Sequence, residues 1–320
     1  MKFTVGIAAL ALALTTSAGA QDFPTKPIRI VSPFTPGTGA DLLARTMAPF
    51  LEERLKQPVI VENRPGAGGQ IGNAYVARST PDGYTLLIGS QTIGMQKYLI
   101  KNLGFDPDKD LTPVYKLVAL KIVLATNVEV PAKTLGEFAN YAKQNPGKVF
   151  YGGLGPTGVV DMSLEMVNRD FGMGITPVQY QGPPQYVTAL LRNEVQLTWG
   201  SMGVIKQHVE ANKLRILAAV SHERLADMPS LPTLRESGYK GFVPVTWLGI
   251  FAPAGTPKPV LDRLGREFAA VLQDPQVRAK LNDSLGLMPL QSSPESFSKE
   301  YTEEMKVWAA AFKASNVVPQ

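Results

Sequence analysis

The 320-residue sequence contains no cysteine, which excludes disulfides, thiolate metal sites and a cysteine nucleophile. Histidine is almost as scarce. His208 and His222 are the two present, and neither has a second ligand at metal-binding spacing, so we expect no metal and no cofactor. The segment TWGSMG approaches the G-x-S-x-G elbow of serine hydrolases, but Trp199 stands where the first glycine belongs. Familiar catalytic constellations are therefore absent.

Blocks of like charge are also missing. The formal net charge is +5, and removing Lys2 with residues 1–20 leaves 5 − 1 = +4. Lysine and arginine are scattered among acidic residues, so the sequence gives no sign of nucleic-acid binding. Beyond the N-terminal segment, no apolar run reaches the length of a membrane span.

The N-terminal segment itself is typical of a secretory signal peptide. Lys2 supplies a positive start, an apolar run of about ten residues follows where a membrane span needs roughly twenty, and Ala18-Gly19-Ala20 offers a small-residue cleavage site. We expect residues 1–20 to be removed and the mature protein to be periplasmic. Without disulfides it must be stabilised by its core, and a hydrophobic content of 44% suffices for two lobes.

Strands alternate with helices along most of the chain, a rhythm that predicts parallel sheets in a doubly wound architecture. Two long apolar runs interrupt it, LTPVYKLVALKIVLATN and FVPVTWLGIFAPAG, and the first is too long for one ordinary strand. We interpret them as two crossings between lobes. The prediction is a two-lobed α/β protein whose two doubly wound sheets are joined by two crossing strands. Lobe 1 comprises residues 21–121 and 248–320, lobe 2 comprises residues 122–247, and the ligand cleft lies between them.

The C-terminal segment is predicted to be helical. Apolar residues recur at three- and four-residue spacing after Pro257, Pro275 and Pro294, and Ser293 is a candidate N-cap for the last helix. We expect these helices to cover the first lobe.

One glycine cluster, GLGPTG at residues 153–158, fits the G-x-G-x-x-G spacing of dinucleotide-binding loops. However, Pro156 removes one donor amide, and the next strand ends at Tyr180 and Gln181 without an acidic residue for a ribose hydroxyl. Export also separates the protein from the cytosolic dinucleotide pool. Dinucleotide binding is therefore disfavoured.

Four corners at strand-to-helix turns are better candidates for a binding site. They lie at residues 33–41, 89–92, 152–157 and 180–184. In open α/β sheets ligands bind beyond the carboxyl ends of strands, and helix N-termini favour anions. The corners contain no lysine or arginine, but they contain hydroxyl and amide side chains: Thr35, Thr38, Ser90, Gln91, Thr92, Thr157 and Gln181. An anion bound there would be held by amides, hydroxyls and helix dipoles. Ordinary turn chemistry is the alternative, since glycine, proline and threonine also suit turns.

Aromatic residues stand at or beside these corners: Phe34, Tyr151, Tyr180 and Trp199. They could line a pocket around the apolar body of a ligand, or they could be core residues at strand ends.

The corners also carry family motifs. The stretches FPTKPIRIVSPFTPGTGADLLAR, QPVIVENRPGAGGQIG, TPDGYTLLIGS, NKLRILAAVSHERLADMPSLPTLRESG and WLGIFAPAGTPKPVLDRL resemble the periplasmic solute receptors of tripartite tricarboxylate transporters, the Bug family. The resemblance implies a hinge-closing receptor with the type II periplasmic-binding fold. Its partners would be a small carboxylate and the membrane subunits of the transporter. We expect a monomer that binds no nucleic acid.

In that family the loop matching residues 33–41 grips a ligand carboxylate, and the loops matching the other corners complete the cleft. The resemblance therefore implies these ligand-binding residues: Phe34, Thr35, Pro36, Gly37, Thr38, Gly39, Asp41, Ser90, Gln91, Thr92, Gly153, Leu154, Gly155, Thr157, Tyr180, Gln181 and Ser201.

The sequence departs from the family pattern at several positions that we expect around the cleft wall. Thr38 stands where a second glycine is common, Asp161 where a histidine is common, and Gln196 where an aspartate is frequent, while Pro156 and Thr157 change a loop that is usually richer in glycine and serine. These changes bear on the identity of the ligand.

Two functions remain open at this point. A receptor for a dicarboxylate is favoured, and the aromatic corners suggest an aromatic one such as terephthalate. The alternative is an exported α/β enzyme acting on a small carboxylate with Asp41 or Asp161 as a base, although carboxylates at helix starts are more often caps.

Overall fold

The computed structural model describes residues 23–154, 159–314 and 319. The expected signal peptide lies outside the described residues, and so do Gly155 and Thr157 of the third corner. Among the described residues, no helix combines the length and the apolar character needed to cross a membrane.

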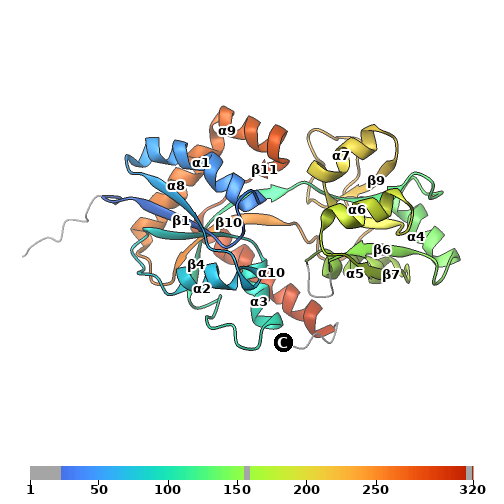
Figure 1. The fold of residues 1–320 in the computed structure, drawn as a ribbon, viewed down its shortest axis with the longest axis horizontal. Coiled ribbons are helices and arrows are strands. Elements are labelled where there is room, and N and C mark those ends of the chain that lie inside the picture. The colour runs from blue at the N-terminus through green and yellow to red at the C-terminus, as the bar shows by residue number, and fades with distance from the viewer. Residues whose placement is uncertain (1–22, 155–158, 315–318, 320) are drawn as a thin grey trace, which may run out of the picture.

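Two separate sheets form two lobes (Figure 1). The first lobe is built on a six-stranded sheet of order β11-β4-β10-β3-β1-β2. Its elements are β1 (Ile28–Ser32), α1 (Gly39–Leu55), β2 (Val59–Asn63), the short turn η1 (Ala67–Gly69), α2 (Gln70–Ala77), β3 (Thr85–Gly89), α3 (Thr92–Leu99), β4 (Leu111–Leu120), β10 (Trp247–Pro253), α8 (Lys258–Gln273), α9 (Pro275–Ala279), the π-turn η2 (Lys280–Ser284), β11 (Leu287–Pro289) and α10 (Pro294–Ala314).

The second lobe is built on a five-stranded sheet of order β7-β6-β8-β5-β9. Its elements are β5 (Ile122–Asn127), α4 (Leu135–Gln144), β6 (Phe150–Gly153), α5 (Val159–Phe171), β7 (Thr176–Gln179), α6 (Pro183–Leu191), β8 (Leu197–Ser201), α7 (Met202–Glu210) and β9 (Leu214–Ala219).

Both sheets are mixed, whereas the sequence rhythm predicts parallel ones. Strand β1 is parallel to β2 and β3, and β6 is parallel to β7 and β8, as the alternation of strands and helices requires. Strand β10 is antiparallel to β3 and β4, and β5 is antiparallel to β8 and β9. The antiparallel strands adjoin the two crossings, because a chain arriving from the other lobe enters the sheet from the opposite end.

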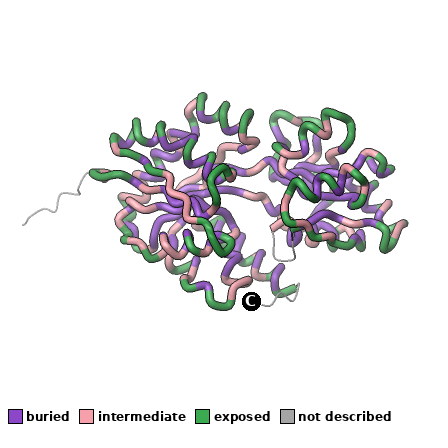
Figure 2. The backbone as a smooth tube through the Cα atoms, in the orientation of Figure 1, coloured by how far each residue is buried: buried purple, intermediate pink, exposed green. Residues whose placement is uncertain are grey.

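Each sheet of the two-lobed fold is covered on both faces, as expected for doubly wound layers. In β1, Ile30 faces a core shared with α1 and α8, while the next residue, Val31, faces a core shared with α2, α3 and α10. The second sheet is covered by α4 and α5 on one face and by α6 and α7 on the other. Buried residues accordingly follow the strands through the middle of each lobe in Figure 2.

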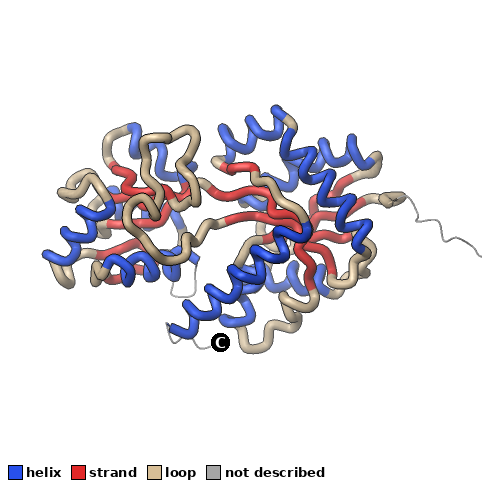
Figure 3. Tube along the Cα trace, turned by 180° about the vertical axis from the view of Figure 1, so that it is seen from behind, coloured by secondary structure: helices blue, strands red, loops and turns tan. Residues whose placement is uncertain are grey.

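Two chain segments connect the lobes. The first long apolar run divides into β4 and β5 at Lys121, which belongs to neither strand. The second connection enters the first sheet at Trp247, and the two connections are joined where the backbone N–H of Leu120 donates to the carbonyl of Thr246 at 2.8 Å. Figure 3 shows these strands passing between the lobes, with α10 lying across the first sheet and extending toward the second lobe.

The C-terminal helices cover the first lobe. Both α8 and α10 pack against β4. The hydroxyl of Ser293 accepts the backbone N–H of Ser296 at 3.1 Å, which confirms Ser293 as the cap of α10. Strand β11 is not predicted from the sequence, because its three residues are too few to establish a periodicity.

Candidate functional site

The first corner is shaped by a buried carboxylate at the start of α1. Asp41, whose side chain is 2% exposed, accepts the backbone N–H of Gly37 at 2.9 Å on Oδ2. Its Oδ1 accepts Arg45 Nε at 2.9 Å and Asn63 Nδ2 at 2.9 Å. Burial opposes ionisation of Asp41, but these hydrogen bonds outweigh it and lower its pKa. The aspartate is therefore engaged in fixing the loop.

Arg45 and Asn63 complete this corner through their hydrogen bonds, and the sequence analysis does not identify them. Asn63 Nδ2 also donates to the carbonyl of Phe34 at 3.1 Å, and an Arg45 N–H donates to Asn63 Oδ1 at 2.8 Å. The Asp41–Arg45 pair could have been found from its four-residue spacing on a helix. Asn63 could not, since it arrives from the end of another strand.

Free amides remain at the start of α1. The first helical hydrogen bond runs from Leu42 N–H to the carbonyl of Thr38. No described residue accepts a hydrogen bond from the amides of Gly39, Ala40 or Asp41. The start of α1 lies on the side of the first lobe that faces the second (Figure 1). Amides at a helix N-terminus attract anions through their own N–H groups and the helix dipole.

Thr38, the departure from the family pattern, closes the loop on itself. Its hydroxyl donates to the carbonyl of Thr35 at 3.0 Å and makes no cap hydrogen bond to the helix. Gly37 beside it has φ +85°, a conformation that glycine adopts without strain.

Gly72, in the glycine-rich motif GAGGQIG after β2, packs directly against the first corner. A Cβ on Gly72 would lie 2.8 Å from Pro33 Cα and 2.9 Å from the carbonyl oxygen of Arg64. Both are backbone atoms, so the turn of α2 that carries Gly72 can approach Pro33 this closely only without a side chain.

The second corner follows β3. The hydroxyls of Ser90 and Thr92 lie 2.8 Å apart, and one donates to the other. Gln91 between them is fully buried, and its Oε1 accepts the backbone N–H of Trp247 at 3.4 Å. Ser90 and Thr92 therefore lie at the corner, whereas the Gln91 side chain points into the protein toward the start of β10.

The third corner, like the first, is shaped by a buried carboxylate that accepts a backbone N–H from the loop. The backbone N–H of Leu154 donates to Oδ2 of Asp161 at 2.6 Å, and Asp161 is 3% exposed at the start of α5. A Cβ on Gly153 would lie 2.0 Å from Oδ1 of the same carboxylate, so any side chain there would displace Asp161. Leu154 projects outward at 39% exposure.

The fourth corner joins the third. The backbone N–H of Tyr180 donates to the carbonyl of Gly153 at 2.9 Å, and the N–H of Gln181 donates to Gln185 Oε1 at 2.8 Å. Burial raises the pKa of the Tyr180 phenol, with a smaller contribution from Glu194, so the phenol is a neutral hydrogen-bonding group. Ser201 ends β8, which is parallel to β6, so it lies at the same edge of the sheet.

The corners gather at one edge of each sheet. In the first lobe, Ser32 and Gly89 end neighbouring parallel strands, so the first two corners share an edge. In the second lobe, Gly153, Gln179 and Ser201 end the parallel strands β6, β7 and β8. Each lobe therefore presents one set of corners.

Two of the four aromatic candidates are core residues. Tyr151 and Trp199 are 2% and 1% exposed and belong to the hydrophobic core of the second lobe. Phe34 and Tyr180 are partly exposed. Of the four candidates, Phe34 and Tyr180 therefore remain available for an aromatic lining.

Gln196 lies away from the corners, contrary to expectation. It precedes β8, and its Oε1 accepts the backbone N–H of Phe150, the first residue of β6, at 2.9 Å. The corners lie at the opposite ends of these parallel strands. The substitution of glutamine for aspartate therefore alters the edge of the sheet opposite the corners.

Within the part of the chain that the structure describes, no group of three histidine, cysteine, aspartate or glutamate residues is arranged to hold a metal ion.

Comparison with known proteins places these features in a family. The family described as "Tripartite tricarboxylate transporter family receptor" matches residues 43–317. A relative from Bordetella pertussis, a protein of the UPF0065 group, is 36% identical over 260 residues, which cover 81% of this chain and 80% of the relative.

Three solved structures share the fold along their whole length. The periplasmic binding protein BugD is 32% identical, with a TM-score of 0.73 over 93% of this chain and 100% of BugD. Rpa4515 from R. palustris, solved with adipate, is 31% identical, with a TM-score of 0.76 over 93% and 100% of the two chains. MatC from Rhodopseudomonas palustris, with bound malate, is 31% identical, with a TM-score of 0.71 over 91% and 100%.

These matches also decide between the two functions left open by the sequence. The family and the fold are those of periplasmic binding proteins and not of enzymes, so Asp41 and Asp161 are not catalytic bases. This chain belongs to the tripartite tricarboxylate transporter receptor family, the group of solute receptors that includes the Bug proteins.

Proposed function

We propose that this receptor captures a small dicarboxylate between its two lobes and delivers it to the membrane subunits of a tripartite tricarboxylate-type transporter. One ligand carboxylate binds the first corner, at the free amides of Gly39 and Ala40. The corners of the second lobe, including Leu154, Tyr180 and Ser201, enclose the rest of the ligand when the lobes close. Ligand binding shifts the protein from an open to a closed population.

The observation that carries this proposal is the set of three amides without an acceptor among the described residues at the start of α1, which follows a loop that Asp41 fixes. Support for a dicarboxylate comes from the two similar proteins solved with adipate and malate. The four corner segments contain no lysine or arginine, and Arg45 beside the first corner is paired with Asp41, so we expect the ligand to be held without a direct salt bridge. An aromatic dicarboxylate such as terephthalate would depend on Phe34 and Tyr180.

A thermal-shift screen with adipate, malate and terephthalate tests the ligand class. A ligand that binds the folded state raises the melting temperature in proportion to RT ln(1 + [L]/Kd), and a receptor releases it unchanged. If none of a wider set of mono- and dicarboxylates stabilises the protein, or if the bound compound is converted, the proposal fails.

Gly39→Ala tests the position of the site. A Cβ on Gly39 meets no atom within 4 Å and φ there is not positive, so the methyl group fits the free protein but covers the amides offered to the ligand. Gly136→Ala is the matched control, because Gly136 is also in the first turn of a helix, α4, with open space around it. We expect Gly39→Ala to lower affinity at least tenfold and Gly136→Ala to leave it unchanged. Equal affinities would move the site elsewhere.

The proposal also places the mature receptor in the periplasm as a monomer, after cleavage before Gln21. The mass of the protein recovered from a periplasmic extract, and its elution volume, test these two points. A retained N-terminus would contradict the signal peptide.

A further inference from the structure

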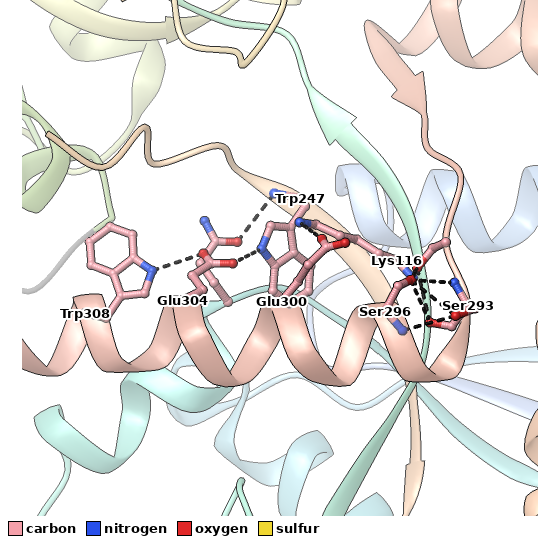
Figure 4. Close-up of polar contacts among 9 residues, drawn as sticks. Lys116, Trp247, Ser293, Ser296, Glu300, Glu304 and Trp308 are labelled. Atoms are coloured by element: carbon pink, nitrogen blue, oxygen red, sulfur yellow. Dashed lines mark hydrogen bonds and ion pairs between the residues drawn. The ribbon is translucent and has the colours of Figure 1, made fainter. Parts of the chain in front are cut away.

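A buried carboxylate lies between two indole rings beside the connections of the lobes. Glu304 on α10 is 7% exposed, and each of its oxygens accepts one indole N–H: Trp247 Nε1 at 2.7 Å and Trp308 Nε1 at 3.1 Å (Figure 4). Both tryptophans are 0% exposed. A buried carboxylate is costly unless it is hydrogen-bonded, so the three side chains form one unit. None of the four corners includes them.

Trp247 connects this unit to the second corner. It is the first residue of β10, directly after Thr246, whose carbonyl accepts the N–H of Leu120 from the other connection. The backbone N–H of Trp247 donates to Oε1 of Gln91. This hydrogen bond fixes the orientation of the Gln91 amide. If the amide were flipped, its NH₂ group would face the N–H of Trp247, and two donors would oppose each other. The indole of Trp247 is thus anchored by Glu304 and its backbone lies at the hinge.

Trp308 connects the same unit to the second lobe. Its ring packs edge-on against Phe242, with centroids 6.2 Å apart and planes at 78°. Phe242 directly precedes Val243 and follows Tyr239 by three residues, and both of these belong to the core of the second lobe. Met162 of α5 joins the apolar cluster that contains Trp308. Helix α10 therefore packs on the first sheet and touches the second lobe.

Charged groups face the carboxylate from two elements. Lys116 on β4 pairs with Glu300 at 3.0 Å, and its Nζ lies 5.5 Å from the centroid of the Trp247 ring. Burial, the largest effect, raises the pKa of Glu304 although the two indoles and Lys116 lower it, and Glu300 adds to the rise. The buried phenol of Tyr301 also interacts with Glu304.

We infer that Glu304 is a positioning residue that sets the arrangement of the two lobes. It holds Trp247 at one of the two connections and Trp308 against Phe242. These contacts limit how far the second lobe can move relative to the first. Loss of either hydrogen bond frees one indole and widens the range of lobe arrangements. The consequence for affinity rests on the proposed function: a smaller closure-competent population lowers apparent affinity in proportion.

The test measures the distance between the lobes. Because the chain has no cysteine, Glu53→Cys on α1 and Lys143→Cys on α4, both at exposed positions, give one spin label in each lobe. Distance distributions are recorded for this pair alone and combined with Glu304→Gln, Trp308→Phe or Glu303→Gln. Glu304→Gln places an amide NH₂ against one indole N–H, and Trp308→Phe keeps a ring but loses the donor. Glu303→Gln is the control, because Glu303 lies on the exposed face of α10 and pairs with Lys306.

We expect broader distributions for Glu304→Gln and Trp308→Phe, and an unchanged one for Glu303→Gln. Distributions that coincide for all four proteins would overturn the inference. Trp308→Phe keeps the test decisive if Glu304→Gln does not fold. A role in stability alone would lower the unfolding midpoint without changing the distance distribution.

Adipate binding is measured on the same proteins. If the parent binds adipate, its affinity should fall roughly tenfold in Glu304→Gln, the change expected for one lost hydrogen bond to a charged group. An unchanged affinity would count against the inference. If the parent does not bind adipate, the proposed ligand class is weakened while the distance measurement still decides the role of Glu304.

Discussion

Asp41 and Asp161 hold equivalent positions in the two lobes: each is the third residue of its helix, and each accepts a backbone N–H from the loop before it. The donors are Gly37 at 2.9 Å and Leu154 at 2.6 Å. Both carboxylates are buried. Each lobe thus uses a buried carboxylate to shape a loop, and at the start of α1 the amides of Gly39 and Ala40 offer positive partial charge.

Asp41→Asn should destabilise the protein in a pH-dependent way. At neutral pH we expect a loss of about 1–3 kcal/mol, because buried donors lose a charged acceptor. The pKa of Asp41 is lowered from its ordinary value of 3.8, so its contribution is present above pH 3.8 and is lost as pH falls through the folded-state pKa. Urea unfolding of both proteins at several pH values measures this. A difference that stays constant through the acid range would contradict it.

Gly72→Ala should displace the first corner. The added Cβ would lie 2.8 Å from Pro33 Cα, and overpacking against backbone costs about 1–3 kcal/mol. Gly203→Ala, in the first turn of α7 with no atom within 4 Å, is the control. Thermal unfolding should show a lower midpoint for Gly72→Ala alone. Equal midpoints would mean that the motif around Gly72 does not support the loop.

Gln196→Glu should lower stability without changing ligand affinity. Gln196 Nε2 donates to the carbonyl of Asn193 at 2.7 Å, and a carboxylate in its place would oppose that oxygen. We expect a loss of about 1–3 kcal/mol at neutral pH. Denaturant unfolding and ligand titration, performed together, measure the two effects. A change in affinity at unchanged stability would return Gln196 to the cleft wall.

Glu304→Gln should change how stability depends on pH. The pKa of Glu304 is raised above its ordinary value of 4.5, so its contribution is fully present below pH 4.5 and is lost as pH rises through the folded-state pKa. The wild type should therefore lose stability relative to the glutamine variant above pH 4.5. Parallel stability curves for the two proteins would show that Glu304 does not titrate differently on folding.

Local pattern predicted much of this fold. The alternation of strands and helices gives the parallel strands β1–β3 and β6–β8, and the excessive length of the run around Lys121 indicates the break between β4 and β5. Ser293 is recognisable as a cap from its position alone. In each case the signal lies within a few neighbouring residues.

What the sequence could not predict depends on contacts between distant segments. Asn63 reaches Asp41 only because β2 lies beside β1, and Trp247 meets Glu304 from 57 residues away. Tyr151 and Trp199 stand beside corners in sequence, but the pleat of their strands turns them into the core. The rear position of Gln196 likewise follows from strand direction.

The position of β10 has a consequence for the order in which the chain folds. It lies between β4 and β3, so the middle of that sheet cannot be completed until residues 247–253 have been synthesised. All strands of the second sheet lie between Ile122 and Ala219 and are available earlier. During synthesis from the N-terminus the second lobe can therefore form first. Until β10 is synthesised, nearly half a chain later, β3 has an unpaired edge.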